Sequence, residues 1–129
     1  MEEIELFGKW WKNSRGETDG WVFRLCGDRV RWSYHALFDA ANWEYSDGSA
    51  SFSRDDFQRL LQIFLERGEA NLSTAEADVA LERQGDSRIR VSVHLHNGGI
   101  GATGVIERIP DHVFEVFGVI HSLEKGGIS

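Results

Sequence analysis

The sequence predicts an α+β fold, a two-layer sandwich in which two helices pack on one face of a mostly antiparallel sheet. Three observations predict it: an apolar hairpin around residues 27–28, alternating runs between residues 75 and 106, and two stretches with helical apolar spacing. The sheet is expected to combine an N-terminal hairpin with a three-stranded meander. The chain shows no repeat, linker or low-complexity tract, so residues 1–129 are expected to form a single domain.

The N-terminal hairpin is predicted from a two-residue turn at Gly27-Asp28, a sequence that suits such a turn. This turn places apolar residues opposite one another, in the pairs Leu25–Val30, Phe23–Trp32 and Trp21–Tyr34. All three pairs fall on one face, as a half-buried strand requires, so Trp21 and Trp32 are expected in the core.

Residues 35–52 lack a clear period and are predicted to form a long loop or an irregular edge strand. A helix is predicted next, because Ser53 and Asp56 fit a capping box and Gly68 suits the C-terminal end. Its apolar side chains recur with helical spacing at Phe57, Leu60, Leu61, Phe64 and Leu65.

The meander is predicted from two alternating runs, Ala75 to Leu81 and Ile89 to Leu95. Their apolar residues share a face only if the connection is odd, so we expect the three-residue loop Gly85-Asp86-Ser87. In this register the polar face carries the pairs Glu82–Arg90, Asp78–His94 and Glu76–His96.

A turn at Asn97-Gly98 is predicted to lead into the third strand. The resulting pairs are Leu95–Ile100, Val93–Ala102, Val91–Gly104 and Ile89–Ile106. A last helix is expected to start at Pro110 and stop at Gly126-Gly127, with its apolar face formed by Val113, Phe114, Val116, Phe117, Ile120 and Leu123.

The composition limits the classes of function. With 14 basic and 21 acidic residues the net charge is −7, which argues against direct nucleic-acid binding and leaves open acidic proteins that mimic nucleic acid or face a basic partner. No apolar run approaches the roughly 18 residues of a membrane span, and the N-terminus is acidic where a secretory signal is basic. We therefore expect a cytoplasmic protein that does not bind membranes.

No motif for catalysis is present, so we expect a non-enzyme without a cofactor. The one cysteine, Cys26, lies beside Arg24 and Arg29, which are expected to favour its thiolate slightly, but a lone strand cysteine is usually passive. The glycines of residues 97–101 lack the lysine and the following helix of a phosphate-binding loop.

The candidate binding region is the segment around Trp43. An aromatic side chain flanked by acids is typical of a protein interface whose centre is apolar and whose rim is charged. Trp10 and Trp11 point to opposite faces if they lie on a strand, so one of them is expected to be partly exposed. The predicted partner-binding residues are Trp11, Asp39, Asn42, Trp43, Glu44, Tyr45 and Asp47. The alternative for Trp43 is a lid folded back on the core.

A weaker alternative is a metal site on the polar face of the meander. His94 and His96 share a face, and the predicted register brings Asp78 and Glu76 opposite them. Exposed sheet pairs explain the same residues, and the spacing matches no metal motif.

The second half of the chain, mainly residues 53–125, resembles the WapI-type immunity proteins of bacterial polymorphic toxin systems. The resemblance lies in Phe57-Gln58-Arg59-Leu60-Leu61, in the strand–turn–strand run from Glu82 to Val91, in Asn97-Gly98-Gly99, and in the closing helix. The segment Asp39-Ala40-Ala41-Asn42-Trp43 is also similar to a stretch of that family. The resemblance implies an antitoxin that binds and blocks a cognate toxin domain.

Together these observations predict a non-catalytic inhibitor that binds a protein partner, most simply an immunity protein. Three alternatives stay open: a phage-encoded inhibitor of a host nucleic-acid-binding defence complex, a small-ligand or carbohydrate-binding module using Trp11 and Trp43, and a small metal-dependent hydrolase. The identity of the partner and the oligomeric state do not follow from the sequence.

Overall fold

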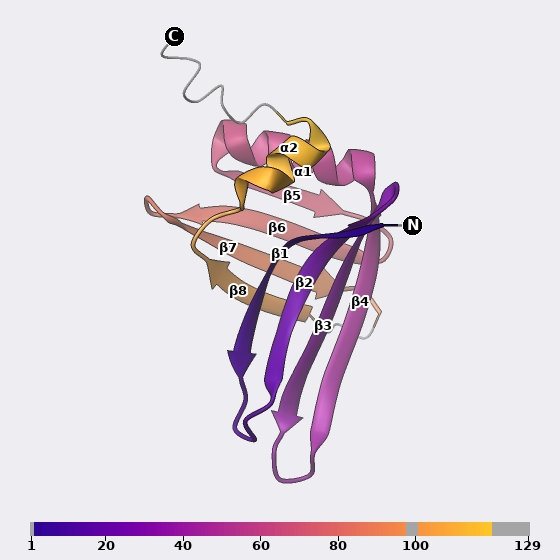
Figure 1. The fold of residues 1–129 in the computed structure, drawn as a ribbon, viewed down its shortest axis with the longest axis vertical. Coiled ribbons are helices and arrows are strands. Elements are labelled where there is room, and N and C mark those ends of the chain that lie inside the picture. The colour runs from indigo at the N-terminus through magenta and orange to yellow at the C-terminus, as the bar shows by residue number, and fades with distance from the viewer. Residues whose placement is uncertain (1, 98–100, 120–129) are drawn as a thin grey trace.

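The computed structural model describes residues 2–97 and 101–119, and it has an α+β fold that is mostly strand (Figure 1). Two four-stranded antiparallel sheets follow the orders β1-β2-β3-β4 and β5-β6-β7-β8. The elements are β1 (Glu3–Lys12), β2 (Thr18–Cys26), β3 (Arg29–Asp39), β4 (Glu44–Ser53), α1 (Arg54–Arg67), β5 (Glu69–Ser73), β6 (Ala77–Gln84), β7 (Arg88–Leu95), β8 (Gly101–Ile106) and α2 (Asp111–Phe117).

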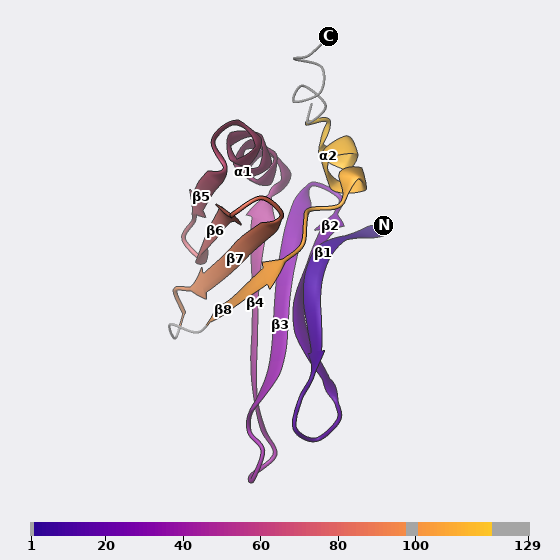
Figure 2. The ribbon, with the colours of Figure 1, turned by 90° about the vertical axis from the view of Figure 1, so that its left-hand side faces the viewer.

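The strands are divided between two sheets, which corrects the prediction of one sheet covered by two helices. Both sheets contribute to one buried core, and the helices lie at one end of it (Figures 1 and 2). The first sheet supplies its large aromatic side chains and the second mainly valines and leucines. Apolar alternation shows which side of a strand is buried but not which strands share a ladder, so a second sheet satisfies the same pattern.

The predicted hairpin registers are confirmed in both sheets. Strands β2 and β3 pair Leu25 with Val30, Phe23 with Trp32 and Trp21 with Tyr34. In the second sheet Gln84 pairs with Arg88 around the predicted three-residue loop, and Val93 pairs with Ala102. Gly98 and Ile100, which belong to the predicted Asn97-Gly98 turn, lie outside the described residues.

Residues 35–52 are mostly strand, so the predicted loop is confined to the short connection between β3 and β4. Strand β4 is an edge strand, as the second half of that prediction proposed, but its pairing with β3 runs without a break from Tyr45 to Ser53. Strands β1 and β5 were not predicted as elements. Alternation is weak in β4 because only Ala50 and Phe52 are buried.

Helix α1 begins and ends where predicted. The Ser53 hydroxyl accepts the N–H of Asp56, and Gly68 adopts the left-handed conformation at the C-terminal end. Helix α2 follows Pro110 as predicted but ends at Phe117, much earlier than expected. Gly118 has φ of 69°, and the N–H of Val119 donates to the carbonyl of Phe114, which closes the helix. Residues 120–129, including the predicted stop, lie outside the described part.

The four strands of the first sheet extend beyond the second sheet at the end opposite the helices (Figures 1 and 2). We call this part the distal end, residues 10–19 and 36–46. It contains the end of β1, the β1–β2 loop, the end of β3 and the turn into β4. Among the described helices none is long and apolar enough to cross a membrane.

Candidate protein-binding surface

The distal end collects most of the residues predicted to bind a partner. Asp39, Asn42, Trp43 and Glu44 lie in or beside the β3–β4 turn, and Trp11 lies near the end of β1. Tyr45 follows on β4, and Asp47 lies two residues further along the same strand, next to the distal end. The structure therefore brings Trp11, which is distant in sequence, to the same end of the sheet as the turn.

Trp43 is held outward in an unusual backbone conformation. Its φ is 57°, the one positive φ among the described non-glycine residues, and 57% of the residue is exposed. A non-glycine residue in this region costs about 1–3 kcal/mol, so the surrounding turn has to hold it there. This exposure argues against the alternative in which Trp43 folds back as a lid on the core.

Asp39 organises the turn that carries Trp43. Its carboxylate accepts the N–H of Ala41 at 3.1 Å, the N–H of Asn42 at 3.3 Å and the side-chain amide of Asn42 at 2.8 Å. The side-chain bond from Asn42 is the main reason that the pKa of Asp39 lies below its ordinary value. Asp39 and Asn42 are thus positioning residues for the tip of the hairpin.

Arg15 joins the β1–β2 loop to this turn. Its guanidinium lies 3.1 Å from the centroid of the Trp43 ring and donates to the carbonyl of Ala40. The loop around Arg15 is itself ordered, because the Asn13 side chain accepts the N–H groups of Arg15 at 2.9 Å and Glu17 at 3.0 Å. A cation over an indole face stabilises the pair by about 0.5–1 kcal/mol at an exposed site.

Asp19 is the one buried charged residue in the described part of the chain, with 1% of its surface exposed. One carboxylate oxygen accepts the N–H of Leu37 at 2.8 Å, and the other accepts the side-chain amide of Asn13 at 2.9 Å. The β2–β3 ladder ends at the pair Gly20–His35, so Asp19 replaces the next ladder bond. Asp19 therefore ties the β1–β2 loop to the end of β3.

Exposed aromatic residues gather on the distal end. Of the large hydrophobic residues that the structure describes, four are exposed, namely Trp10 at 50%, Trp11 at 38%, Phe38 at 63% and Trp43 at 57%, and all four lie there. Both adjacent tryptophans are exposed, where one was expected to be. Exposed apolar side chains at one end of the fold make the distal end the candidate interaction surface.

Acidic side chains also lie at or beside the distal end, where two of them contact Tyr45 or its stacking partner His35. Glu17 accepts the hydroxyl of Tyr45, and this hydrogen bond raises the pKa of Tyr45. Asp47 is paired with His35, whose ring stacks on Tyr45 with centroids 4.8 Å apart. The distal end thus combines exposed aromatic side chains with nearby carboxylates, a combination that suits protein binding.

Three residues of the distal end were not predicted from the sequence, namely Arg15, Asp19 and Phe38. Asp19 and Phe38 each had a local signal in the sequence. Asp19 is a charged residue, and Phe38 an aromatic one, at positions where the alternation of β2 and β3 continues. The contact of Arg15 with Trp43 joins two loops and had no signal in the sequence.

Asp78 lies opposite His94 as predicted, but its carboxylate pairs at the surface with His96, for which Glu76 was the predicted partner. Nε2 of His96 lies 3.1 Å from the Asp78 carboxylate, which raises the pKa of His96. A hydrogen bond from Ser73, followed by the one from His96, lowers the pKa of Asp78. In residues 2–97 and 101–119 no group of three or more His, Cys, Asp or Glu side chains is arranged to hold a metal ion. His94, His96 and Asp78 therefore do not form such a group.

Cys26 corrects a further expectation. Its thiol lies 3.2 Å from the Glu3 carboxylate, and desolvation together with that hydrogen bond raises its pKa. Arg24 faces Glu3 at 3.7 Å, and Arg29 donates to the Ser51 hydroxyl. Desolvation and Glu3 outweigh the opposing charges of Arg31 and Arg24, so the thiolate is disfavoured and not favoured.

No protein-family model matches the chain, and no curated protein matches it. The distal end is therefore characterised by its own side chains and their geometry. Its features are exposed aromatic anchors, a rigid hydrogen-bonded support and an acidic rim.

Proposed function

We propose that this protein is a non-catalytic inhibitor that binds and neutralises a protein partner, acting as an immunity protein against a bacterial toxin domain. The observation that carries the proposal is the gathering of Trp10, Trp11, Phe38 and Trp43 on the distal end. Large aromatic residues in water are costly unless a partner covers them, and they are the residue types that dominate binding energy at protein interfaces.

The rigidity of the distal end favours tight binding. Asp19, Asp39 and Arg15 hold the two loops by hydrogen bonds and by the contact with Trp43. A surface that is ordered before binding loses less conformational entropy when the complex forms. An inhibitor that has to block its target completely benefits from such a preformed surface.

The charge of the chain favours a basic partner. The whole chain carries −7, and Glu17, Asp39, Glu44 and Asp47 lie around the exposed aromatics. Complementary charge speeds association and orients the two proteins. A toxin domain that acts on nucleic acid needs a basic surface, so it fits this rim. The resemblance of residues 53–125 to WapI-type immunity proteins supports the same class of partner.

The test is binding to the protein encoded next to this one, because toxin and immunity genes lie together. We expect a stable complex by isothermal titration calorimetry, and we expect Trp43→Ala or Trp11→Ala to weaken it at least ~10-fold, as the loss of an aromatic anchor does. Arg88→Ala, at the exposed β6–β7 turn, is the matched control and should bind as the wild type does. Absence of a complex, or equal affinity of all variants, would refute the proposal.

A further inference from the structure

Strand β4 forms one edge of the first sheet, and its outward hydrogen-bonding groups can be assigned from two independent contacts. The N–H of Leu37 on β3 points to β2, where it donates to Asp19, so its neighbours of the same parity also face β2. The N–H of Ser51 on β4 points away from β3 and donates to the Glu76 carboxylate at 3.2 Å. Both contacts indicate that the odd-numbered residues of β4 direct their N–H groups away from β3.

The backbone groups of Asp47 and Ser49 therefore point outward, because alternate residues of a strand point to the same side. In the described part of the chain neither N–H has a hydrogen-bond partner. Ser51, two residues further on, has its outward N–H occupied. The open stretch of the edge is the part of β4 that precedes Ser51.

This edge lacks the features that normally prevent strand addition. Exposed edges are usually short, bulged or protected by lysine or proline. Strand β4 has 10 residues, contains neither residue type, and pairs with β3 without a bulge from Tyr45 onward. The opposite edge, β1, carries two lysines and a bulge, and its Glu5 carbonyl is occupied by His112 at 3.0 Å.

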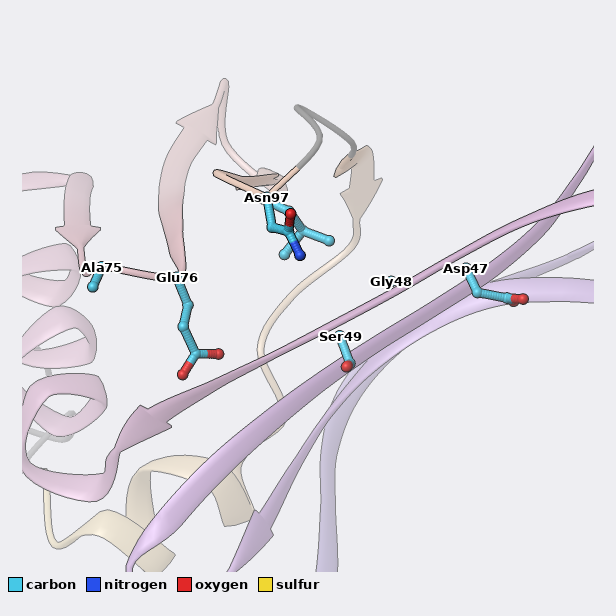
Figure 3. A pocket seen from close by; sticks show the side chains of 7 residues that line it. Asp47, Gly48, Ser49, Ala75, Glu76 and Asn97 are labelled. Carbon is cyan, nitrogen blue, oxygen red and sulfur yellow. The ribbon is translucent and has the colours of Figure 1, made fainter.

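A polar cavity of about 380 Å³ lies beside the open stretch (Figure 3). Its lining comes from β4 on one side and from the β5–β6 turn and the end of β7 on the other: Asp47, Gly48, Ser49, Ala75, Glu76, Leu95 and Asn97. The Glu76 side chain extends from its turn towards β4 (Figure 3). Of the described lining residues two are carboxylates and none is basic. Asp47 already pairs with His35 and Glu76 with the Ser51 N–H, but each carboxylate keeps a second oxygen that can accept from a positively charged side chain.

We propose that β4 binds an extended segment of the partner protein as an added strand, with a lysine or arginine side chain of that segment in the cavity between Asp47 and Glu76. This inference rests on the proposed function, to which it adds a second contact and the chemistry of the bound segment. Main-chain hydrogen bonds supply affinity in strand addition, and side-chain pockets supply specificity.

The occupant is a basic segment and not a second copy of this chain. Pairing of two β4 edges would bring Asp47 carboxylates together between two proteins that each carry −7. Like charges that face each other across a strand pair are destabilising. A basic segment, in contrast, gains from both carboxylates of the cavity.

The test needs no natural partner. The full chain, labelled with ¹⁵N, is titrated with a capped peptide of alternating threonine and lysine and, as the matched probe, with the same peptide in which glutamate replaces lysine. We expect saturable shifts of the Asp47 and Ser49 amide signals with the lysine peptide and at least ~10-fold weaker binding of the glutamate peptide. Glu76→Gln should weaken the lysine peptide, whereas Asp86→Asn, the same charge change at the β6–β7 turn, should not.

A second variant tests the backbone contact. Ser49→Pro removes an outward donor without removing a bond to β3, so it should abolish the shifts, and its spectrum reports whether it is folded. No shift at millimolar lysine peptide, equal binding of both peptides, or a concentration-dependent dimer would overturn the inference. If the peptide fails but the complex with the neighbouring protein still depends on Trp43, only the strand addition is wrong; if the peptide binds but no such complex forms, the proposed function is wrong.

Discussion

Asp19 gives the sharpest prediction about how the distal end is held together. It is 1% exposed, and its carboxylate accepts two hydrogen bonds, from Leu37 N–H at 2.8 Å and from the Asn13 amide at 2.9 Å. A hydrogen bond to a charged group stabilises a protein by about 1.5–3 kcal/mol. Asp19→Ala removes both bonds. Because Leu37 and Asn13 are half-buried and reach water after the change, we expect a loss of stability near the lower limit for two such bonds, about 3 kcal/mol.

Asp19→Asn separates the two bonds. Its amide keeps one acceptor for the N–H of Leu37 but presents an NH₂ group to the NH₂ of Asn13. Asn13 cannot rotate its amide to compensate, because its oxygen already accepts the N–H groups of Arg15 and Glu17. We therefore expect about half the loss of Asp19→Ala, roughly 1.5 kcal/mol.

The assay is urea unfolding followed by tryptophan fluorescence, with the free energies of unfolding compared at equal m-values. Asp86→Ala, an exposed acid in the β6–β7 turn, is the control and should change stability by less than about 0.5 kcal/mol. A loss of less than about 1 kcal/mol for Asp19→Ala, or equal losses for the alanine and asparagine variants, would refute the reasoning.

Three further predictions concern other parts of the molecule. Because the pKa of His96 is raised by Asp78, the pair stabilises the folded state at pH values below the ordinary histidine pKa, and this contribution disappears as the pH rises through the folded value. His96→Asn should therefore flatten the dependence of the urea midpoint between about pH 5 and 8, and an unchanged profile would contradict this role. The pKa of Cys26 is raised by burial and by Glu3, so alkylation by iodoacetamide at neutral pH should be slow and should accelerate in Glu3→Gln, as mass spectrometry would report; equal rates would exclude an effect of Glu3. In Gly104→Ala the added Cβ would lie 3.0 Å from Lys9 Cδ and 3.0 Å from Trp21 Nε1, and because Trp21 is buried we expect a loss of about 1–3 kcal/mol of stability, with the exposed Thr103→Ala as a control that should stay near the wild type.

Local rules explain the part of the fold that was predictable. The turn at Gly27-Asp28 and the odd loop at residues 85–87 each set a register by parity, and both registers form as expected. Ser53 and Gly68 define the ends of α1 because capping depends on residues within one turn of the helix. In each case the deciding interaction lies within a few residues.

The unpredicted features depend on contacts between distant segments. The hydrogen bond from Lys9 to the Val105 carbonyl at 2.7 Å joins the two sheets, and no period in the sequence encodes it. Strand β4 buries only Ala50 and Phe52, and its other residues are partly or fully exposed, so it lacks the alternation that burial imposes. The early end of α2 at Gly118 was missed because the apolar spacing continues past it.

The candidate site was predictable in part for the same reason. Trp43 and its neighbouring acids stood out by composition, and the turn does present them outward. Arg15, which lies over the Trp43 ring, comes from another loop and was not predictable. Phe38 was missed because it lies at the end of a strand that appeared irregular.

The most direct test of the central claim is a hydrogen-exchange footprint of the complex with the protein encoded beside this one. If the distal end is the binding surface, backbone amides of residues 10–19 and 36–46 should gain protection on binding, while those of α1 and of the β6–β7 turn keep their free rates. Protection confined to α1, α2 or the β6–β7 turn, with the distal end unchanged, would contradict it.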